Sequence, residues 1–507
     1  MNLVLVSSEV SPYSKSGGLG DAVAGLAKAY ARAGHRVWTV SPRYRGVAPE
    51  AAFTGVVARV PLAAWEHHVE LSVVERDGVT HLLVDNGMYD RDGLYGDDNG
   101  TYGDNHIRFA LLCQAALHGA RRLIEDEGLG DVVFHCHDWQ ASLLPAYLKA
   151  CWRPLGLLER AGTVLTLHNP AHQGRFGPGL FVDLELPARW FTPWGLEFHG
   201  DLAMLKGGIL HADQLTTVSP TFARELVTPG GGFGLESVLL GRGVDLTGIL
   251  NGIDDREWDP AGDPHLAEPY DADALEGKAA CKAALQRELG LPVAPDAPLV
   301  GCVTRLDPQK GVELLVDSVP WLADRGAQVV VLGSAAAAHR TFEHRLRDLE
   351  GRYPDRVRAW IGYSEPVAHR IMGGADLFAM PSLFEPCGLT QMYAQRYGTV
   401  PVVRRTGGLA DSVEPVEGPT RATPLPLRRR VQAREEREPV RGAGAGFVFD
   451  RPSGAALREA LWRALECYEH DRPRFDTIRR HGMRRDFSWD RAVREYTTVC
   501  ERAAALR

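Results

Sequence analysis

Residues 297–334 read APLVGCVTRLDPQKGVELLVDSVPWLADRGAQVVVLGS, which predicts a complete strand–helix–strand unit. The first apolar run predicts a strand, residues 311–325 predict a helix, and AQVVVLGS predicts a second strand. The strands are continuously apolar rather than alternating, as is typical of a parallel sheet covered by helices on both faces. This stretch therefore predicts a doubly wound α/β fold, in which ligands bind at the carboxyl ends of the strands.

The same alternation extends in both directions from this stretch. After it come a predicted helix at 338–350, the strands VRAWIGY and ADLFAMPS, a helix from Leu389, and the strand TVPVV. The first half shows strands in LVLV, HRVWTVS, VVFHCHDW, GTVLTLHN and DQLTTVSP, with alanine-rich or apolar helices between several of them. We therefore expect two Rossmann-like doubly wound domains.

The length of 507 residues is too great for one ordinary core. We predict an N-terminal domain at 1–260, a C-terminal domain at 261–490, and a last helix at 491–507 that crosses back to the first domain. Residues 254–296, where Asp, Pro and Ala collect, contain the expected boundary. Residues 414–442 break the α/β pattern with Pro, Arg and Glu, and predict a solvated mobile loop, with contact to a polyanion or a partner as the alternative.

Composition excludes several classes of protein. The net charge of -8 argues against a nucleic-acid binder. No apolar run has the length of a membrane span, and the start MNLVLVSSEV predicts a first core strand rather than a signal peptide. The eight cysteines are scattered without a CxxC pair, which predicts reduced thiols and no structural zinc site. We expect a cytoplasmic protein.

The stretch KSGGLGD at 15–21 places Lys15, Gly17 and Gly18 between a strand and a helix, which is typical of an anion site and often of a phosphate site. A dinucleotide fingerprint would need G-x-G-x-x-G and an acid after the second strand. That strand ends TVSPRY, so a nicotinamide oxidoreductase is disfavoured. A surface lysine on a loop remains an alternative for Lys15.

The second half offers a stronger set of candidates. TRLDPQKG places Arg305 and Lys310 directly after a strand, where two cations can hold a diphosphate, with a salt-bridged loop as the alternative. PSLFEPCGLT places Glu385 in a short loop and residues 388–390 at a helix start, where backbone N–H groups suit a phosphate. Glu385 would face a sugar hydroxyl or developing positive charge, or it would only cap the helix.

Histidines end two predicted strands of the first half. HCHDW places His135 and His137 on one face of a strand and Asp138 after it, and TLHNPAHQG places His168 at the end of another strand. Paired histidines invite a metal site, but no third ligand stands at a suggestive spacing. The sequence therefore favours hydrogen-bonded histidines and a site without metal.

These motifs together resemble the bacterial glycogen synthase and plant starch synthase family. The resemblance runs in order from Met1 to about Trp489. It is carried by KSGGLGD, YGDNHIRFALLC, HCHDWQA, TLHNPAHQG, LKGGILHAD, LNGID, TRLDPQKG and DFSWD. The stretch RIMGGADLFAMPSLFEPCGLTQMYAQRYGTVPVVRRTGGLADSV, from Arg370 to Val413, is specific enough to carry the assignment alone.

The resemblance implies a GT-B-type glycosyltransferase, with two Rossmann-like domains facing across a deep cleft. Such an enzyme moves glucose from ADP-glucose to the non-reducing end of glycogen or another α-1,4-glucan, with retention at the anomeric carbon. It needs neither a metal nor another cofactor. No nucleic acid and no membrane is expected as a partner.

The resemblance also implies roles for individual residues. His168, Arg305, Lys310 and Glu385 would be catalytic, with the two cations on the diphosphate. Tyr363 would lie against the adenine, and Asp21 would contact the donor or cap a helix. The substrate-binding set comprises Lys15, Gly17, Gly18, Asp21, Asp138, Asn169, Asn251, Tyr363, Cys387, Gly388, Leu389 and Thr390.

Three alternatives keep some of these features. A related transferase would use UDP-glucose or a small acceptor. A phosphorylase would need a lysine that anchors pyridoxal phosphate, and no motif for one appears. A non-catalytic glucan-binding protein would be expected to lack at least one of Lys15, His168, Arg305, Lys310 and Glu385, yet all five are present.

Overall fold

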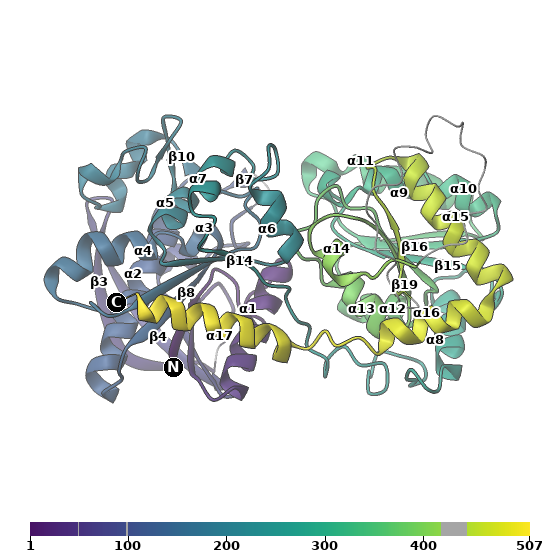
Figure 1. Cartoon of the computed structure of the whole chain (residues 1–507), viewed down its shortest axis with the longest axis horizontal. Helices are drawn as coiled ribbons and strands as arrows, with labels where there is room; N and C mark the ends of the chain where they lie inside the picture. Colours follow the sequence, from purple (N-terminus) through teal and green to yellow (C-terminus); the bar gives the residue numbers. More distant parts are fainter. Residues whose placement is uncertain (49, 98–99, 417–443, 507) are drawn as a thin grey trace. The chain divides into compact units, whose positions relative to one another are not determined.

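The computed structural model describes residues 1–48, 50–97, 100–416 and 444–506. They form two compact units, one of Met1–Asp254 with Phe487–Arg507 and one of Asp255–Asp486 (Figure 1). The sequence placed these boundaries after residues 260 and 490. The Arg-rich run at 428–438 lies outside the described residues. None of the described helices combines the length and apolar character needed to cross a bilayer.

The first unit is built on a nine-stranded sheet in the order β14-β13-β9-β8-β1-β2-β5-β4-β3. Pairing is parallel from β14 to β5. The strands are β1 (Asn2–Val6), β2 (Arg36–Pro42), β3 (Ala52–Leu62), β4 (Trp65–Arg76), β5 (Val79–Asp85), β8 (Val132–His137), β9 (Gly162–Leu167), β13 (Gln214–Thr217) and β14 (Leu246–Gly248).

Helices cover both faces of this sheet because its central strands are apolar on both sides. Leu3 and Leu5 of β1 pack with α1 and α17, whereas Val4 and Val6 pack in the core that contains α2. The helices are α1 (Gly18–Arg32), α2 (Asn105–Glu127), α3 (Asp138–Ala141), α4 (Leu144–Tyr147), α5 (Met204–His211), α6 (Pro220–Leu226), α7 (Glu236–Gly241) and α17 (Trp489–Ala505).

Smaller elements complete the first unit. β10 (Arg175–Phe176), β11 (Glu197–Phe198) and β12 (Asp201–Ala203) form a small antiparallel sheet, and β6 (Gly96–Asp97) pairs with β7 (Gly100–Thr101). Short 3-10 helices span Gly87–Tyr89, Arg153–Leu155, Pro178–Leu184 and Ala188–Trp190, and a π-helical turn spans Leu148–Trp152.

The second unit contains a six-stranded parallel sheet in the order β17-β16-β15-β18-β19-β20. Its strands are β15 (Leu299–Val303), β16 (Gln328–Gly333), β17 (Val357–Ile361), β18 (Leu377–Met380), β19 (Val400–Arg404) and β20 (Phe447–Phe449). Its helices are α8 (Glu276–Glu288), α9 (Val312–Val316), α10 (Val319–Asp324), α11 (Thr341–Arg352), α12 (Glu365–Gly374), α13 (Thr390–Arg396), α14 (Gly407–Ser412), α15 (Gly454–His470) and α16 (Arg472–Met483), with 3-10 turns at Pro308–Lys310 and Ala337–His339.

Both sheets follow the doubly wound pattern, and this decides where ligands bind. In the first unit the strand order reverses between β1 and β8, and in the second it reverses between β15 and β18. Open parallel sheets bind ligands outside the carboxyl ends of the strands at this point. The loops after these four strands are therefore the first place to look for a site.

Two predicted helices are broken into shorter ones. The helix expected at 311–325 is α9 followed by α10, because Pro320 lies in the first turn of α10 and has no N–H for a continuous ladder. The helix expected at 141–150 is divided in the same way, with Pro145 at the start of α4.

The last helix, α17, belongs to the first unit, and Figure 1 shows it in yellow beside α1. Trp489 is 4% exposed and packs where α1 has Gly25. A Cβ on Gly25 would lie 2.1 Å from Nε1 of Trp489, so the close approach requires a glycine there.

Candidate active site

The glycine-rich loop after β1 is held by a buried carboxylate. Glu9 is 3% exposed and accepts hydrogen bonds from the Ser16 backbone N–H at 2.6 Å, the Ser16 hydroxyl at 2.7 Å and the Tyr95 hydroxyl at 2.5 Å. This clamp fixes the approach to α1, whose N-cap is Gly17. Glu9 is not among the site residues predicted from the sequence, although an acid in the loop after a buried strand is itself a signal.

Lys15 and Asp21 come from the same loop and form an ion pair of 2.9 Å. Gly17 is extended and makes no side-chain cap, and an added Cβ there would meet nothing within 4 Å. Asp21 stands in the first turn of α1. The loop thus presents the start of α1 and a lysine already oriented by Asp21.

Three histidines form a row at the carboxyl ends of β8 and β9. The rings of His135 and His137 stack at 4.4 Å, and Nδ1 of His137 lies 3.0 Å from Nε2 of His168. His135 is held at the inner end by Thr166, 2.6 Å from its Nε2. Burial lowers the pKa of His135 and of His168 to about 3, and lowers the pKa of His137 well below its usual value.

The unpaired Nε2 of His137 indicates which ring nitrogens of His137 and His168 carry protons. Nε2 of His137 is buried and has no hydrogen-bond partner among the described residues. An unmatched lone pair costs less there than an unmatched N–H, so we assign the proton to Nδ1 of His137. His137 then donates to Nε2 of His168, and the neutral His168 ring presents Nδ1–H as a donor.

Asp138 positions the loop that carries His168. It begins α3 with a φ of +57°, and one oxygen accepts the backbone N–H groups of His168 at 2.7 Å and Asn169 at 3.2 Å. Burial raises its pKa to about 6 against these two hydrogen bonds. The Asn169 side chain closes a local turn by accepting the Ala171 N–H at 3.2 Å.

Asn251 follows β14 and is 6% exposed, and its Oδ1 has no hydrogen-bond partner in the described part of the chain. The neighbouring Gly252 packs against the backbone of Trp489, 2.6 Å from where its Cβ would be. Ile253 donates its N–H to the carbonyl of Phe487 at 2.8 Å. The start of α17 therefore positions Asn251, a role that the DFSWD motif did not reveal.

In the second unit, the loops after β15 and β18 touch each other. Gly311 has a φ of +64°, and a Cβ there would lie 2.1 Å from the Pro381 carbonyl oxygen. The Leu383 N–H donates to the Gln309 carbonyl at 2.7 Å. These contacts hold two candidate loops side by side at the reversal point of the sheet.

Lys310 and Glu385 form an ion pair across these two loops. Nζ of Lys310 lies 2.9 and 2.7 Å from the two carboxylate oxygens, and the side chains are 17% and 6% exposed. The Ser382 hydroxyl donates to the same carboxylate at 2.9 Å. The sequence predicted both residues as catalytic without predicting this contact.

Arg305 lies in the loop after β15 that also carries Lys310. It is exposed, and its guanidinium makes no hydrogen bond or ion pair within the described ranges. Tyr363, after β17, is 75% exposed, and its hydroxyl donates to Glu365 at 2.9 Å. An exposed ring and an unengaged guanidinium are both available to a ligand.

Residues 387–390 run from the Glu385 loop into α13. Cys387 is buried, and Gly388 has a φ of +69° with Gln391 packed against its Cα. Leu389 is the N-cap of α13, and the Thr390 hydroxyl points to the sulfur of Met380 at 3.4 Å. Their contact with a phosphate stays a prediction.

Two glycines of TGGLAD support the Glu385 loop. A Cβ on Gly407 would lie 2.1 Å from the Glu385 carbonyl oxygen, and one on Gly408 would lie 2.0 Å from that of Cys387. The Gly408 N–H also donates to the Glu385 carbonyl at 3.0 Å. The sequence showed this motif, but only the fold shows that it carries the Glu385 loop.

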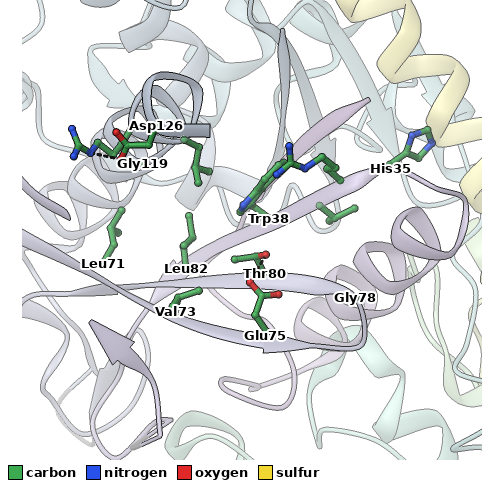
Figure 2. A pocket seen from close by; sticks show the side chains of 14 residues that line it. His35, Trp38, Leu71, Val73, Glu75, Gly78, Thr80, Leu82, Gly119 and Asp126 are labelled. Carbon is green, nitrogen blue, oxygen red and sulfur yellow. Dashed lines mark hydrogen bonds and ion pairs between the residues drawn. The ribbon is translucent and has the colours of Figure 1, made fainter. Parts of the chain in front are cut away.

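A cavity of about 540 Å³ lies elsewhere in the first unit. Figure 2 shows that His35, just before β2, Trp38 of β2, Thr80 of β5 and Gly119 of α2 line it. No predicted site residue lines it. We therefore place the active site at the loops described above.

Two family models match most of the chain. Residues 2–241 match the starch synthase catalytic domain, and residues 297–423 match the glycosyl transferases group 1. The glycogen synthase of Anaeromyxobacter dehalogenans is 44% identical over 98% of both chains. Soluble starch synthase 1 of Oryza sativa subsp. japonica is 40% identical over 99% of this chain and 78% of that protein.

Solved structures agree with these matches. The catalytic domain of starch synthase IV from Arabidopsis thaliana, bound to ADP and acarbose, superposes with a TM-score of 0.87 at 32% identity, with 99% of each chain covered. A sucrose-phosphate synthase from Thermosynechococcus elongatus shares the fold, with a TM-score of 0.61 at 16% identity. The chain therefore belongs to the glycogen synthase and starch synthase family, and it is a glucan-synthesising glycosyltransferase of the GT-B fold.

Proposed function

We propose that this enzyme transfers glucose from ADP-glucose to the non-reducing end of an α-1,4-glucan such as glycogen, with retention at the anomeric carbon. The observation that carries the proposal is the group of Arg305, Lys310 and Glu385 at the reversal point of the second sheet. The relatives named glycogen synthase and the solved relative bound to ADP support the choice of donor and acceptor.

Arg305 and Lys310 stabilise the leaving diphosphate. Breaking the bond between the glucose C1 and the phosphate oxygen adds negative charge to the leaving group. Arg305 offers its whole guanidinium, which binds phosphate oxygens in a two-pronged manner. Lys310 uses two of its three N–H groups on Glu385, and the third is left for the phosphate.

Glu385 orients Lys310 and the transferred glucose rather than attacking C1. Lys310 donates to both oxygens of Glu385, and Ser382 donates to one of them. These hydrogen bonds make the carboxylate a weaker nucleophile. A single carboxylate beside strong leaving-group cations differs from the paired carboxylates of glycosidases. The leaving phosphate instead accepts the proton of the acceptor hydroxyl as the new C1–O bond forms on the same face.

Residues of the first unit hold the glucose and the phosphates. The Nδ1–H of His168 donates to a glucose hydroxyl, and the unpaired Oδ1 of Asn251 accepts from another. Lys15, Gly17 and Gly18 contact the donor phosphates at the start of α1. Asp138 and Asn169 act by positioning the His168 loop.

The exposed ring of Tyr363 stacks on the adenine. Asp21 acts by orienting Lys15. Cytoplasmic localisation stays a prediction, since it rests only on the sequence.

The test is incorporation of labelled glucose into glycogen, with ADP-glucose and UDP-glucose assayed in parallel. We expect incorporation from ADP-glucose and little from UDP-glucose. Incorporation from UDP-glucose alone would assign a different donor. Binding of glycogen without incorporation from either donor would favour a non-catalytic glucan-binding protein.

A further inference from the structure

A second group of polar side chains lies in the second unit and meets the proposed donor site only through Glu365, which accepts the Tyr363 hydroxyl at 2.9 Å. Ligand atoms of Glu257, Glu365 and His369 all lie within 4.8 Å of one another. Glu365 begins α12 and His369 follows one turn later, so both occupy the same face of that helix. Glu257 comes from the segment just after the start of the unit.

The ring of His369 is fixed before any ligand arrives. His369 is 2% exposed, and its Nδ1 lies 2.7 Å from a carboxylate oxygen of Asp263. The Tyr397 hydroxyl donates to the same oxygen at 2.6 Å. One face of the imidazole stacks on Trp258, with ring centroids 3.8 Å apart and planes 14° from parallel.

These contacts determine which nitrogen of His369 keeps the proton. The Asp263 oxygen that lies 2.7 Å from Nδ1 also accepts the Tyr397 hydroxyl, so it acts as the acceptor for the Nδ1–H of His369, which leaves a lone pair on Nε2. In the described part of the chain, the hydrogen bonds of His369 are all made at Nδ1, with Asp263 and Tyr397.

A buried imidazole whose Nδ1–H is held by a carboxylate keeps Nε2 for a ligand, and with two further carboxylates within 4.8 Å this is the usual arrangement behind a metal ion. The orientation of His369 distinguishes this group from an ordinary cluster of surface acids.

We propose that Glu257, Glu365 and His369 bind a divalent transition-metal ion of the Zn²⁺ class. One imidazole and two carboxylates suit Zn²⁺, whereas Mg²⁺ and Ca²⁺ prefer oxygen ligands alone. Tetrahedral bonds of about 2.0–2.2 Å would bring the ligand atoms to about 3.4 Å apart. The exposed Glu257 and the half-buried Glu365 supply this small contraction. Solvent takes the remaining coordination position.

The first test is a calorimetric titration of the full-length protein with Zn²⁺. We expect one site in the wild type and at least tenfold weaker binding in His369→Gln and in Glu257→Gln. Glu257 is exposed, so its variant tests the site even where replacement of the buried histidine disturbs folding. Asp263→Asn should weaken binding by about 10–100-fold through the orientation of His369.

His470→Gln is the matched control, because His470 is an exposed histidine 4.0 Å from Glu466 on another helix. It should bind Zn²⁺ as the wild type does. Wild-type affinity and stoichiometry in both Glu257→Gln and His369→Gln would overturn the proposal. Displacement of Zn²⁺ by an equal concentration of Mg²⁺ would overturn the assignment to a transition metal.

An optical measurement locates the ion independently. Co²⁺ at Nε2 of His369 would quench the fluorescence of the stacked Trp258, and Trp258→Phe should remove that saturable quenching. Saturable quenching that persists unchanged in both Trp258→Phe and Glu257→Gln would place the ion elsewhere and contradict the proposal.

Discussion

Arg305 offers the cleanest test of the leaving-group role, because its guanidinium makes no hydrogen bond or ion pair in the described part of the chain. We expect Arg305→Ala to lower kcat by about 10²–10³, as removal of a charge-stabilising donor typically does. The thermal midpoint should stay close to that of the wild type, since no intramolecular contact is lost. Steady-state kinetics and a thermal melt measure both effects.

Arg325→Ala is the matched control for that variant. Arg325 lies over the ring of Trp321, in the same unit but away from the candidate loops. Its replacement should leave turnover unchanged. Near-normal turnover in Arg305→Ala would remove Arg305 from the leaving-group site.

Lys310→Ala should differ from Arg305→Ala by changing stability as well as rate. Turnover should fall by about 10² or more, as for the loss of a charge-stabilising group. The variant should still fold, but Glu385 is 6% exposed on its side chain and would lose its cation, which costs about 3 kcal/mol. Urea denaturation measures this loss.

The double variant Lys310→Ala, Glu385→Gln separates these two effects. Without the buried charge, part of the stability should return, whereas turnover should not. Recovery of turnover in the double variant would contradict the assignment of Lys310 to the diphosphate.

The raised pKa of Asp138 should make the difference in stability between the wild type and Asp138→Asn depend on pH. Its folded pKa is about 6 against a usual value of 3.8, because burial disfavours the charged form. Between these values the folded state keeps a proton that the unfolded state has lost, so this carboxyl lowers stability as the pH rises through about 6.

Asp138→Asn removes the charge, and asparagine can still accept both backbone N–H groups at a positive φ. The variant should match the wild type near pH 4 and exceed its stability by about 3 kcal/mol above pH 7. Urea denaturation at three pH values checks this. A difference that does not change with pH would show that burial of this charge is not the cause.

At the scale of elements, Gly25 decides whether α17 can dock. A Cβ there would lie 2.1 Å from the Trp489 ring nitrogen, so Gly25→Ala should force α1 and α17 apart. We expect a loss of about 1–3 kcal/mol, as for an overpacked core. Thermal melts and proteolysis of the C-terminal helix report the change.

Gly241→Ala is the control, since Gly241 is also helical but a Cβ there would meet nothing within 4 Å. It should change stability little. Because Trp489 also supports the Asn251 loop, Gly25→Ala should reduce turnover too. Full stability and activity in Gly25→Ala would show that the contact with Trp489 relaxes freely.

The sequence predicted the parallel strands well because they are apolar on both faces and end in recognisable loops. It missed the antiparallel pairing of β3 with β4 and of β4 with β5, although Asp77-Gly78 is a strong turn signal for the β4–β5 hairpin. It also joined helices that prolines divide, since apolar periodicity continues across Pro145 and Pro320. Turn dipeptides and prolines therefore predict the boundaries of these strands and helices better than apolar periodicity does.

For the molecule as a whole, the sequence predicts the site residues that follow strands. This works because the carboxyl ends of parallel strands lie at one edge of the sheet, where ligands bind. The contacts that hold them could not be read from the sequence. Glu9 holds Ser16, Trp489 packs on Gly25 and Gly408 supports the Glu385 loop, and none of the motifs indicates these pairings. The Glu257–Glu365–His369 group joins segments about 100 residues apart, so no spacing rule reveals it.

The last prediction concerns metal dependence of the whole enzyme. The charge of the leaving diphosphate is assigned to Arg305, Lys310 and Lys15, and none of these needs a metal ion to act. We therefore expect EDTA to leave glucosyl transfer from ADP-glucose intact, even as it removes Zn²⁺ from the Glu257 site. Parallel measurements of turnover and bound zinc on the same sample test both expectations. Inhibition by EDTA that a divalent ion reverses in the wild type and also in Glu257→Gln would mean that the reaction itself uses a metal, and the assignment of the leaving-group charge to these three cations would fail.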